Sequence, residues 1–209
     1  MFKTLIFATV ATLSLAQDYP KPVVPNNFVA ESIHYTYANN RLTPTGAWSS
    51  QKWSSKLNKI YDAQGSLDDE GDEVLDNAEV TDATDKTSVS WKTGDAKCQS
   101  AANIPVEDVS VQISHYFDGF VYAGVQYAPW ELTRVKYHRL DGQGIQYFYK
   151  QSNQMLRFIV WPSDSTTYVW DFTDGLVETD LTEKDFVIIG CMAGVEPTVE
   201  SLIAKLLLQ

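Results

Sequence analysis

Basic and metal-binding side chains are scarce in this chain of 209 residues. It has 16 lysines and arginines against 27 aspartates and glutamates, which gives a net charge of −11. Such an acidic surface repels the phosphates of nucleic acids, so we expect no nucleic-acid partner. The three histidines and two cysteines stand apart, and none has a second one at the spacing of a metal site. We therefore expect neither a metal centre nor a cofactor.

The sequence motifs of common enzymes are missing as well. There is no Gly-x-Ser-x-Gly, no His-Glu-x-x-His, no Gly-x-x-x-x-Gly-Lys and no Cys-x-x-Cys. The many carboxylates leave an acid hydrolase open as an alternative, because glycosidases need only a facing pair of them. They cluster in one stretch, however, and this clustering favours a protein without catalytic activity.

Long hydrophobic runs are also absent, apart from a short one at the beginning. An uncharged run, residues 4–13, follows Lys3 and precedes Ser14-Leu15-Ala16. It is too short to span a bilayer, and its basic, apolar and small-residue parts are typical of a signal peptide. We predict that residues 1–16 are cleaved, that the protein is secreted and that it is not an integral membrane protein. The alternative is a buried N-terminal helix. Residues 17–27, with three prolines, are predicted to be a linker.

The two cysteines are expected to form one disulfide. A secretory route is oxidising, so the simplest arrangement is a bond between Cys98 and Cys191. Such a bond closes a long loop and stabilises the fold by roughly 4 kcal/mol on the chain-entropy model. A reactive thiol or an intermolecular pair is the alternative.

Alternation of period two is the dominant pattern from residue 28 to residue 193. Turn residues recur at close intervals, which is typical of antiparallel strands joined by short loops. The clearest alternation spans Val109–Phe117 and puts His115 on its apolar face. Residues 194–209 have apolar positions at helical spacing and predict an amphipathic C-terminal helix. The predicted strands are residues 28–37, 47–61, 87–92, 109–117, 120–127, 131–140, 145–150, 156–161, 166–172 and 185–191.

An acidic stretch, residues 66–86, interrupts this pattern. It contains the run Asp68-Asp69-Glu70-Gly71-Asp72-Glu73 and is predicted to be a loop, with a short edge strand at Val74-Leu75 as an open alternative. It does not match an EF-hand, since Ser66 and Asn77 occupy positions that should be acidic. A weak calcium site in this loop stays open as an alternative to a solvated loop.

The order of strand ends and cysteines resembles a known family. The relevant segments are Lys59-Ile60-Tyr61-Asp62, Tyr116-Phe117-Asp118-Gly119, residues 144–147, residues 168–172 and residues 186–191. Together they resemble the secreted eukaryotic proteins with a domain similar to the bacterial lipoprotein carrier LolA, among them the ependymin-related proteins. The resemblance covers residues 28–192. Two positions depart from that pattern: the acidic run replaces an arginine-rich strand, and Gly190 replaces a proline before Cys191.

The resemblance implies a mostly β fold, in which a single curved antiparallel sheet forms a half-barrel with a helix against its open side. It also implies an apolar or lipid-like ligand on the concave face. The sequence contains 6 Trp, 11 Tyr and 9 Phe, and such rings are suited to line that face. The alternative is an extracellular structural or interaction protein in which the rings fill a closed core and the acidic loop carries the function. The predicted ligand-binding residues are Trp53, Tyr122, Trp130, Tyr147, Tyr149, Phe158, Tyr168 and Trp170.

Overall fold

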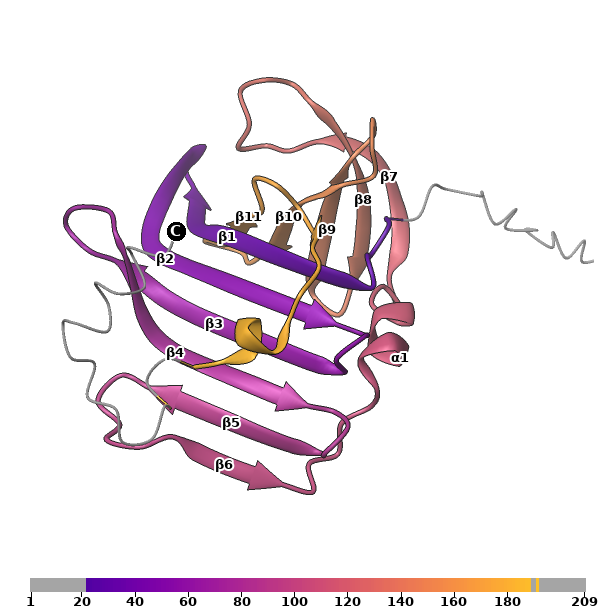
Figure 1. Ribbon diagram of the computed structural model, residues 1–209. Coiled ribbons are helices and arrows are strands. Elements are labelled where there is room, and N and C mark those ends of the chain that lie inside the picture. Colours follow the sequence, from indigo (N-terminus) through magenta and orange to yellow (C-terminus); the bar gives the residue numbers. More distant parts are fainter. Residues whose placement is uncertain (1–21, 189–190, 192–209) are drawn as a thin grey trace, which may run out of the picture.

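The computed structural model describes residues 22–188 and Cys191. Its main feature is one antiparallel sheet, with the strand order β6-β5-β4-β3-β2-β1-β11-β10-β9-β8-β7 and β12 paired to β1 (Figure 1). Most of the expected alternation therefore forms strands, and the expected mostly β fold with a single antiparallel sheet is confirmed. The strands are β1 Asn27–Ala38, β2 Arg41–Ser54, β3 Lys59–Leu67, β4 Glu73–Asp82, β5 Thr87–Lys92, β6 Gln99–Ala102, β7 Val121–Tyr127, β8 Lys136–Gly142, β9 Ile145–Lys150, β10 Leu156–Trp161, β11 Thr167–Asp171 and β12 Val177–Glu178.

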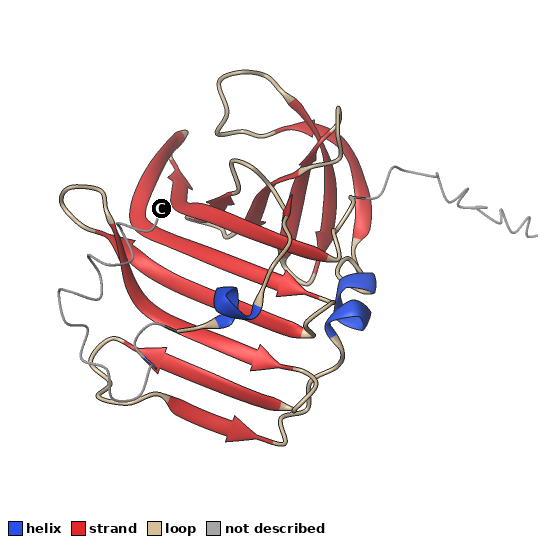
Figure 2. Ribbon diagram, in the orientation of Figure 1, coloured by secondary structure: helices blue, strands red, loops and turns tan. Residues whose placement is uncertain are grey.

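Helical structure is limited to two short elements among the described residues. These are α1, Val109–Ser114, and the 3-10 helix η1, Glu183–Phe186 (Figure 2). No helix in this part of the chain is long and apolar enough to cross a membrane. The expected signal peptide (1–16) and C-terminal helix (194–209) lie outside the described residues, as do residues 17–21 of the expected linker.

The sheet is strongly curved, with β7–β11 behind β1–β6 in Figure 1. One ring shows the degree of curvature. The Tyr116 ring centroid lies 5.8 Å from Trp53 on β2 and 6.4 Å from Tyr147 on β9. Three strands separate β2 from β9, and in a flat sheet the two would be about 19 Å apart. The face that carries Trp53 and Tyr147 is therefore concave.

The concave face is filled at one end by α1. Val109 and Ile113 are both buried there and pack with Phe28 of β1, Ile60 of β3 and Ile159 of β10. Burial of these side chains away from water is the main stabilising contribution at this end of the sheet.

Two segments cover the convex face. The β7–β8 connection brings Trp130 against Phe148 and Phe158, with ring centroids 5.5 and 5.4 Å apart. The C-terminal segment brings Ile188 against Trp48 and Ala63. The Cys98–Cys191 disulfide, with a Cα–Cα distance of 5.3 Å, ties this segment to the chain before β6, so the expected pairing is confirmed.

The clearest predicted strand was wrong. Residues 109–114 form α1, because Val109 and Ile113 lie four residues apart and both face the core. A short alternating run fits a helix face as well as a strand, and tertiary contacts decide between them. His115 ends α1 instead of lying on an apolar strand face; its side chain is 61% exposed and pairs with Asp118.

Other boundaries also differ from the prediction. Residues 47–61 contain a hairpin, because Asn58 takes a left-handed conformation (φ 56) between β2 and β3. Within the acidic stretch 66–86, residues 73–82 form β4, whose Ala78 packs against the C-terminal segment while Glu79 stays in solvent. The predicted strand 185–191 begins inside η1 instead, because Thr182 and Asp185 cap one another.

Candidate functional site

Outside the part that α1 fills, the concave face of β2, β3 and β4 carries polar side chains. Cross-strand register aligns Gln51, Asp62 and Glu79 on β2, β3 and β4, and aligns Ser49, Gln64 and Asn77 one step further along. The Ser32 and Ser49 hydroxyls lie 2.7 Å apart. We call this set the polar rows. Hydroxyl, amide and carboxyl groups there can hydrogen-bond the polar part of a ligand.

Asp62 has an unusual electrostatic environment within the polar rows. The pKa of its carboxyl is raised to about 6: burial is the largest cause, the charge of Glu79 adds to it, and a hydrogen bond with Gln51 opposes it. Asp62 also contributes to the raised pKa of Tyr116, although burial of that hydroxyl is the larger cause. The carboxyl of Asp62 thus changes charge near neutral pH on the concave face.

Aromatic rings line the facing side of the same surface. The His34 ring stacks on Trp170 with 4.3 Å between centroids and 3° between planes, and Trp161 lies 4.7 Å from Trp170. Tyr168, which pairs with Trp161 across the β10–β11 hairpin, is 53% exposed. We call His34, Trp161, Tyr168 and Trp170 the ring cluster. It leaves half-buried apolar surface next to the polar rows.

His34 joins the ring cluster to the polar rows. Its Nε2 lies 3.1 Å from the Ser49 hydroxyl, and burial lowers the pKa of its imidazole to about 4. The ring is therefore neutral at physiological pH and behaves as an uncharged aromatic surface.

The structure does not bring the eight predicted ligand-binding residues into one site. Only Tyr168 and Trp170 belong to the ring cluster. Trp130 and Phe158 pack in the convex-face core instead. None of the eight lines the three cavities described below.

The other four predicted residues lie on the concave side within packed surroundings. Trp53 and Tyr147 contact Tyr116. Tyr149 is fully buried against His138, and the Tyr122 hydroxyl lies 2.8 Å from His138 Nδ1. These rings contribute to the core beneath the candidate site.

The prediction missed His34, Trp161 and Asp62. The alternation of β10 could have paired Trp161 with Ile159 on one face, and the short 162–166 turn could have placed it opposite Tyr168. No local signal places His34 beside Trp170, because this contact depends on the pairing of β1 with β11.

Three cavities lie elsewhere, although the first also borders Ser32 and Ser49 of the polar rows. One of about 340 Å³ lies between β1, β2 and the β11–β12 connection. A second, about 360 Å³, borders Val24, Ile113 and Phe120 near α1, and a third, about 270 Å³, borders Val80 and Phe186–Ile188.

The described residues do not provide a set of ligands for the calcium site that was left open as an alternative. In residues 22–188 and Cys191, no group of three or more acidic, histidine or cysteine side chains is placed to hold a metal ion. In the β3–β4 turn, the Asp68 carboxylate accepts hydrogen bonds from the backbone N–H groups of Glu70 and Asp72.

Comparison with known proteins leaves the family undecided. No family model matches the chain, and no curated protein matches it. Among solved structures, it is similar to one described as the structure of PNGF-II in the C2 space group, with a TM-score of 0.38 and 6% identity. The match covers 76% of this chain and 29% of that one, and at this TM-score it supports no inference about function.

Proposed function

We propose that this protein is a secreted binding protein that holds an amphipathic, lipid-like ligand on the concave face of its sheet, without catalysing a reaction. One observation carries the proposal: the half-buried ring cluster lies next to the polar rows, on the part of the concave face that α1 leaves open. An apolar chain or ring of the ligand packs on Trp161, Tyr168 and Trp170. Its polar end hydrogen-bonds Ser49, Gln51 or Asp62.

Secretion is part of the same proposal. The signal-peptide pattern of residues 1–16 supports it, as does the Cys98–Cys191 disulfide, because such bonds persist in oxidising compartments. Membership of the LolA-like and ependymin-related families likewise stays a proposal, supported by the single curved sheet.

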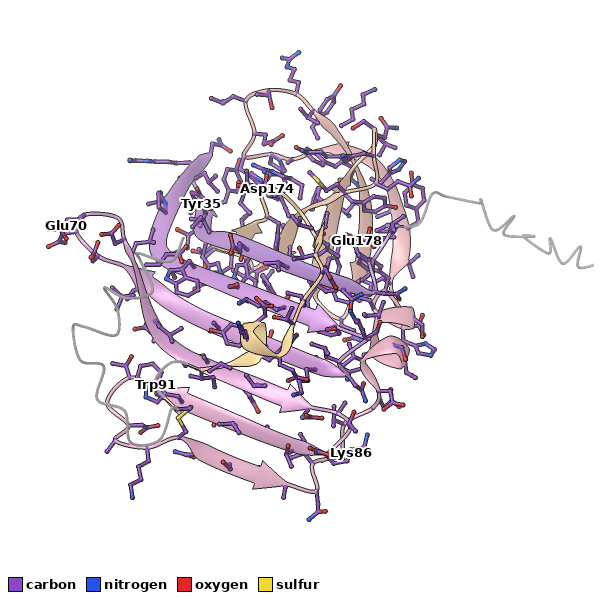
Figure 3. All side chains as sticks on the ribbon, in the orientation of Figure 1. Tyr35, Glu70, Lys86, Trp91, Asp174 and Glu178 are labelled. Carbon is purple, nitrogen blue, oxygen red and sulfur yellow. A yellow bond between two sulfur atoms is a disulfide. The ribbon has the colours of Figure 1, made fainter. Side chains whose placement is uncertain are left out.

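Titration with a fluorescent fatty acid tests the proposed binding. We expect saturable binding that weakens at least tenfold, or about 1.4 kcal/mol, in Trp170→Ala. The matched control is Trp91→Ala, a half-buried tryptophan of β5 that packs on the opposite face (Figure 3). Near-UV circular dichroism checks that both variants are folded.

Two results would contradict the proposal. One is the lack of saturable binding of the fatty acid to the folded, delipidated protein. The other is an equal loss of affinity in both variants, since this would show that the binding surface is not the ring cluster.

A further inference from the structure

A second candidate site lies on the convex face, on the opposite side of β1 from the ring cluster. This cleft of about 340 Å³ lies between β1, β2, the start of β4 and the β11–β12 connection. Its volume is in the range of cavities that bind small molecules.

The floor of the cleft is largely apolar. Val29 and Ile33 of β1 and Trp48 of β2 contribute most of it, with serines of both strands beside them, and Val177 of β12 adds to one wall. Trp48 is buried, and its indole N–H donates a hydrogen bond to the Ser66 carbonyl at 3.1 Å. The N–H is thus already paired, and the ring offers the cleft an apolar, electron-rich surface.

The charged lining of the cleft is entirely negative. Glu31, Glu73, Asp171 and Asp174 reach it from four different segments, and no lysine, arginine or histidine lines it. No ion pair within the described part of the chain involves Glu31, Glu73 or Asp174. The cleft therefore contains uncompensated negative charge above an apolar floor.

Asp171 provides a separate sign that a partner is missing. Its Oδ2 pairs with Arg157 Nη2 at 3.0 Å, whereas its Oδ1 is buried and has no hydrogen-bond partner among the described residues. A buried carboxylate oxygen without a donor costs free energy, and Asp171 lines the cleft.

The arrangement suits an organic cation better than a metal ion. The four carboxylates are spread around the apolar floor, and no three acidic side chains among the described residues are placed to ligate one metal. An ammonium group on an apolar chain can pair with the carboxylates while its chain packs on Trp48 and Ile33. An ammonium also gains from lying over the face of an indole ring.

We propose that the cleft between β1, β2 and the β11–β12 connection binds small amphipathic amines in their ammonium form. The amine sits among Glu31, Asp171 and Asp174, and its apolar chain lies on Val29, Ile33 and Trp48. This site opens on the convex face, whereas the proposed lipid-like site lies on the concave face, and the two share only Ser32 and Ser49.

Isothermal titration with octylamine at neutral pH tests the site, with octanoate as a probe of the same chain length and opposite charge. We expect saturable 1:1 binding of octylamine only. In the double variant Glu31→Gln, Asp174→Asn the affinity should fall at least tenfold. In Glu178→Gln, an exposed carboxylate of β12 that does not line the cleft, it should be unchanged (Figure 3).

Several outcomes would overturn the assignment. They are equal binding of octanoate, an affinity that the double variant leaves unchanged, and binding of calcium or a lysine-rich peptide in place of octylamine. Trp170→Ala distinguishes the two sites, because it should weaken fatty-acid binding and leave the affinity for octylamine unchanged. If it removes octylamine binding, the amine binds on the concave face and the cleft is not its site.

Discussion

Asp62 shows how one residue can make the stability of this protein depend on pH. Its side chain is half-buried on the concave face between Gln51 and Glu79, and its pKa is raised from 3.8 to about 6. A carboxyl with a raised pKa binds its proton more tightly in the folded state. Its contribution to stability is therefore full below about pH 4 and is lost as the pH rises through about 6.

We expect Asp62→Asn to increase the free energy of unfolding by about 1–3 kcal/mol at pH 8. The ionised carboxylate is unfavourable in this half-buried position, and the neutral amide avoids that cost. At pH 3.5 the difference from the wild type should be near zero. Urea denaturation at both pH values measures this. Glu79→Gln, at an exposed neighbouring position, is the control and should have a smaller effect. A gain of the same size at both pH values would contradict the electrostatic explanation.

The pKa of His34 is shifted in the opposite direction to that of Asp62. Because burial lowers the pKa of its imidazole to about 4, the ring should not titrate between pH 5 and pH 8. We expect its ring proton chemical shifts in NMR to stay constant over this range. A His34 midpoint near 6.5 would mean that its ring is not packed on Trp170 as described.

At the scale of elements, α1 depends on a residue from a distant turn. Asn58, between β2 and β3, accepts a hydrogen bond from the Val109 N–H at 2.8 Å and donates to the Asp108 carboxylate at 3.0 Å. Its left-handed backbone (φ 56) aims the side chain at the start of the helix. A helix of six residues is not stable alone, so this contact and the burial of Ile113 hold it.

We expect Asn58→Ala to lower the free energy of unfolding by about 1–3 kcal/mol. It removes a helix cap, and alanine is less stable than asparagine in a left-handed backbone conformation. Asn58→Gly keeps the backbone relaxed and removes only the cap, so it should cost less. Thermal denaturation compares the two. If both variants are as stable as the wild type, Asn58 does not anchor α1.

The sequence pattern predicted β5, β9 and β10 with the correct bounds, and it failed for α1 and β4. The successful strands have turn residues at both ends, such as Gln143-Gly144, which take the left-handed conformations of a tight hairpin. In β4 the apolar alternation is weak, because Ala78 is small, Val80 is only partly buried and several neighbouring positions are acidic.

At the scale of the whole molecule, the disulfide holds the C-terminal segment over the convex face. It joins residues 93 apart in sequence and positions Ile188 against Trp48, Ala63 and Ala78. Constraint of such a long loop is expected to stabilise the fold mainly through the unfolded chain.

Replacement of both cysteines by serine should lower the free energy of unfolding by about 2–4 kcal/mol. Hydrogen exchange should accelerate most in residues 181–188 and least in β9 and β10, which are far from the bond in the strand order. A uniform acceleration across the sheet would contradict a tethering role for the disulfide.

The candidate site could be predicted from the sequence only in part. An abundance of rings on alternating strands was visible, and two of the eight predicted residues, Tyr168 and Trp170, lie in the ring cluster. The others could not be separated from the core, because a sequence does not reveal which covering segment, such as α1 or the β7–β8 connection, buries a given ring.

The sequence by itself determined the antiparallel strands, their short turns and the pairing of Cys98 with Cys191, because these depend on local periodicity and on the presence of only two thiols. The tertiary structure decided which face became concave, which rings stayed accessible and which carboxylates met around one cleft. Alternation defines two faces of every strand, but the hydrogen bonds between β1 and β11 and the packing of α1 determine which face turns inward.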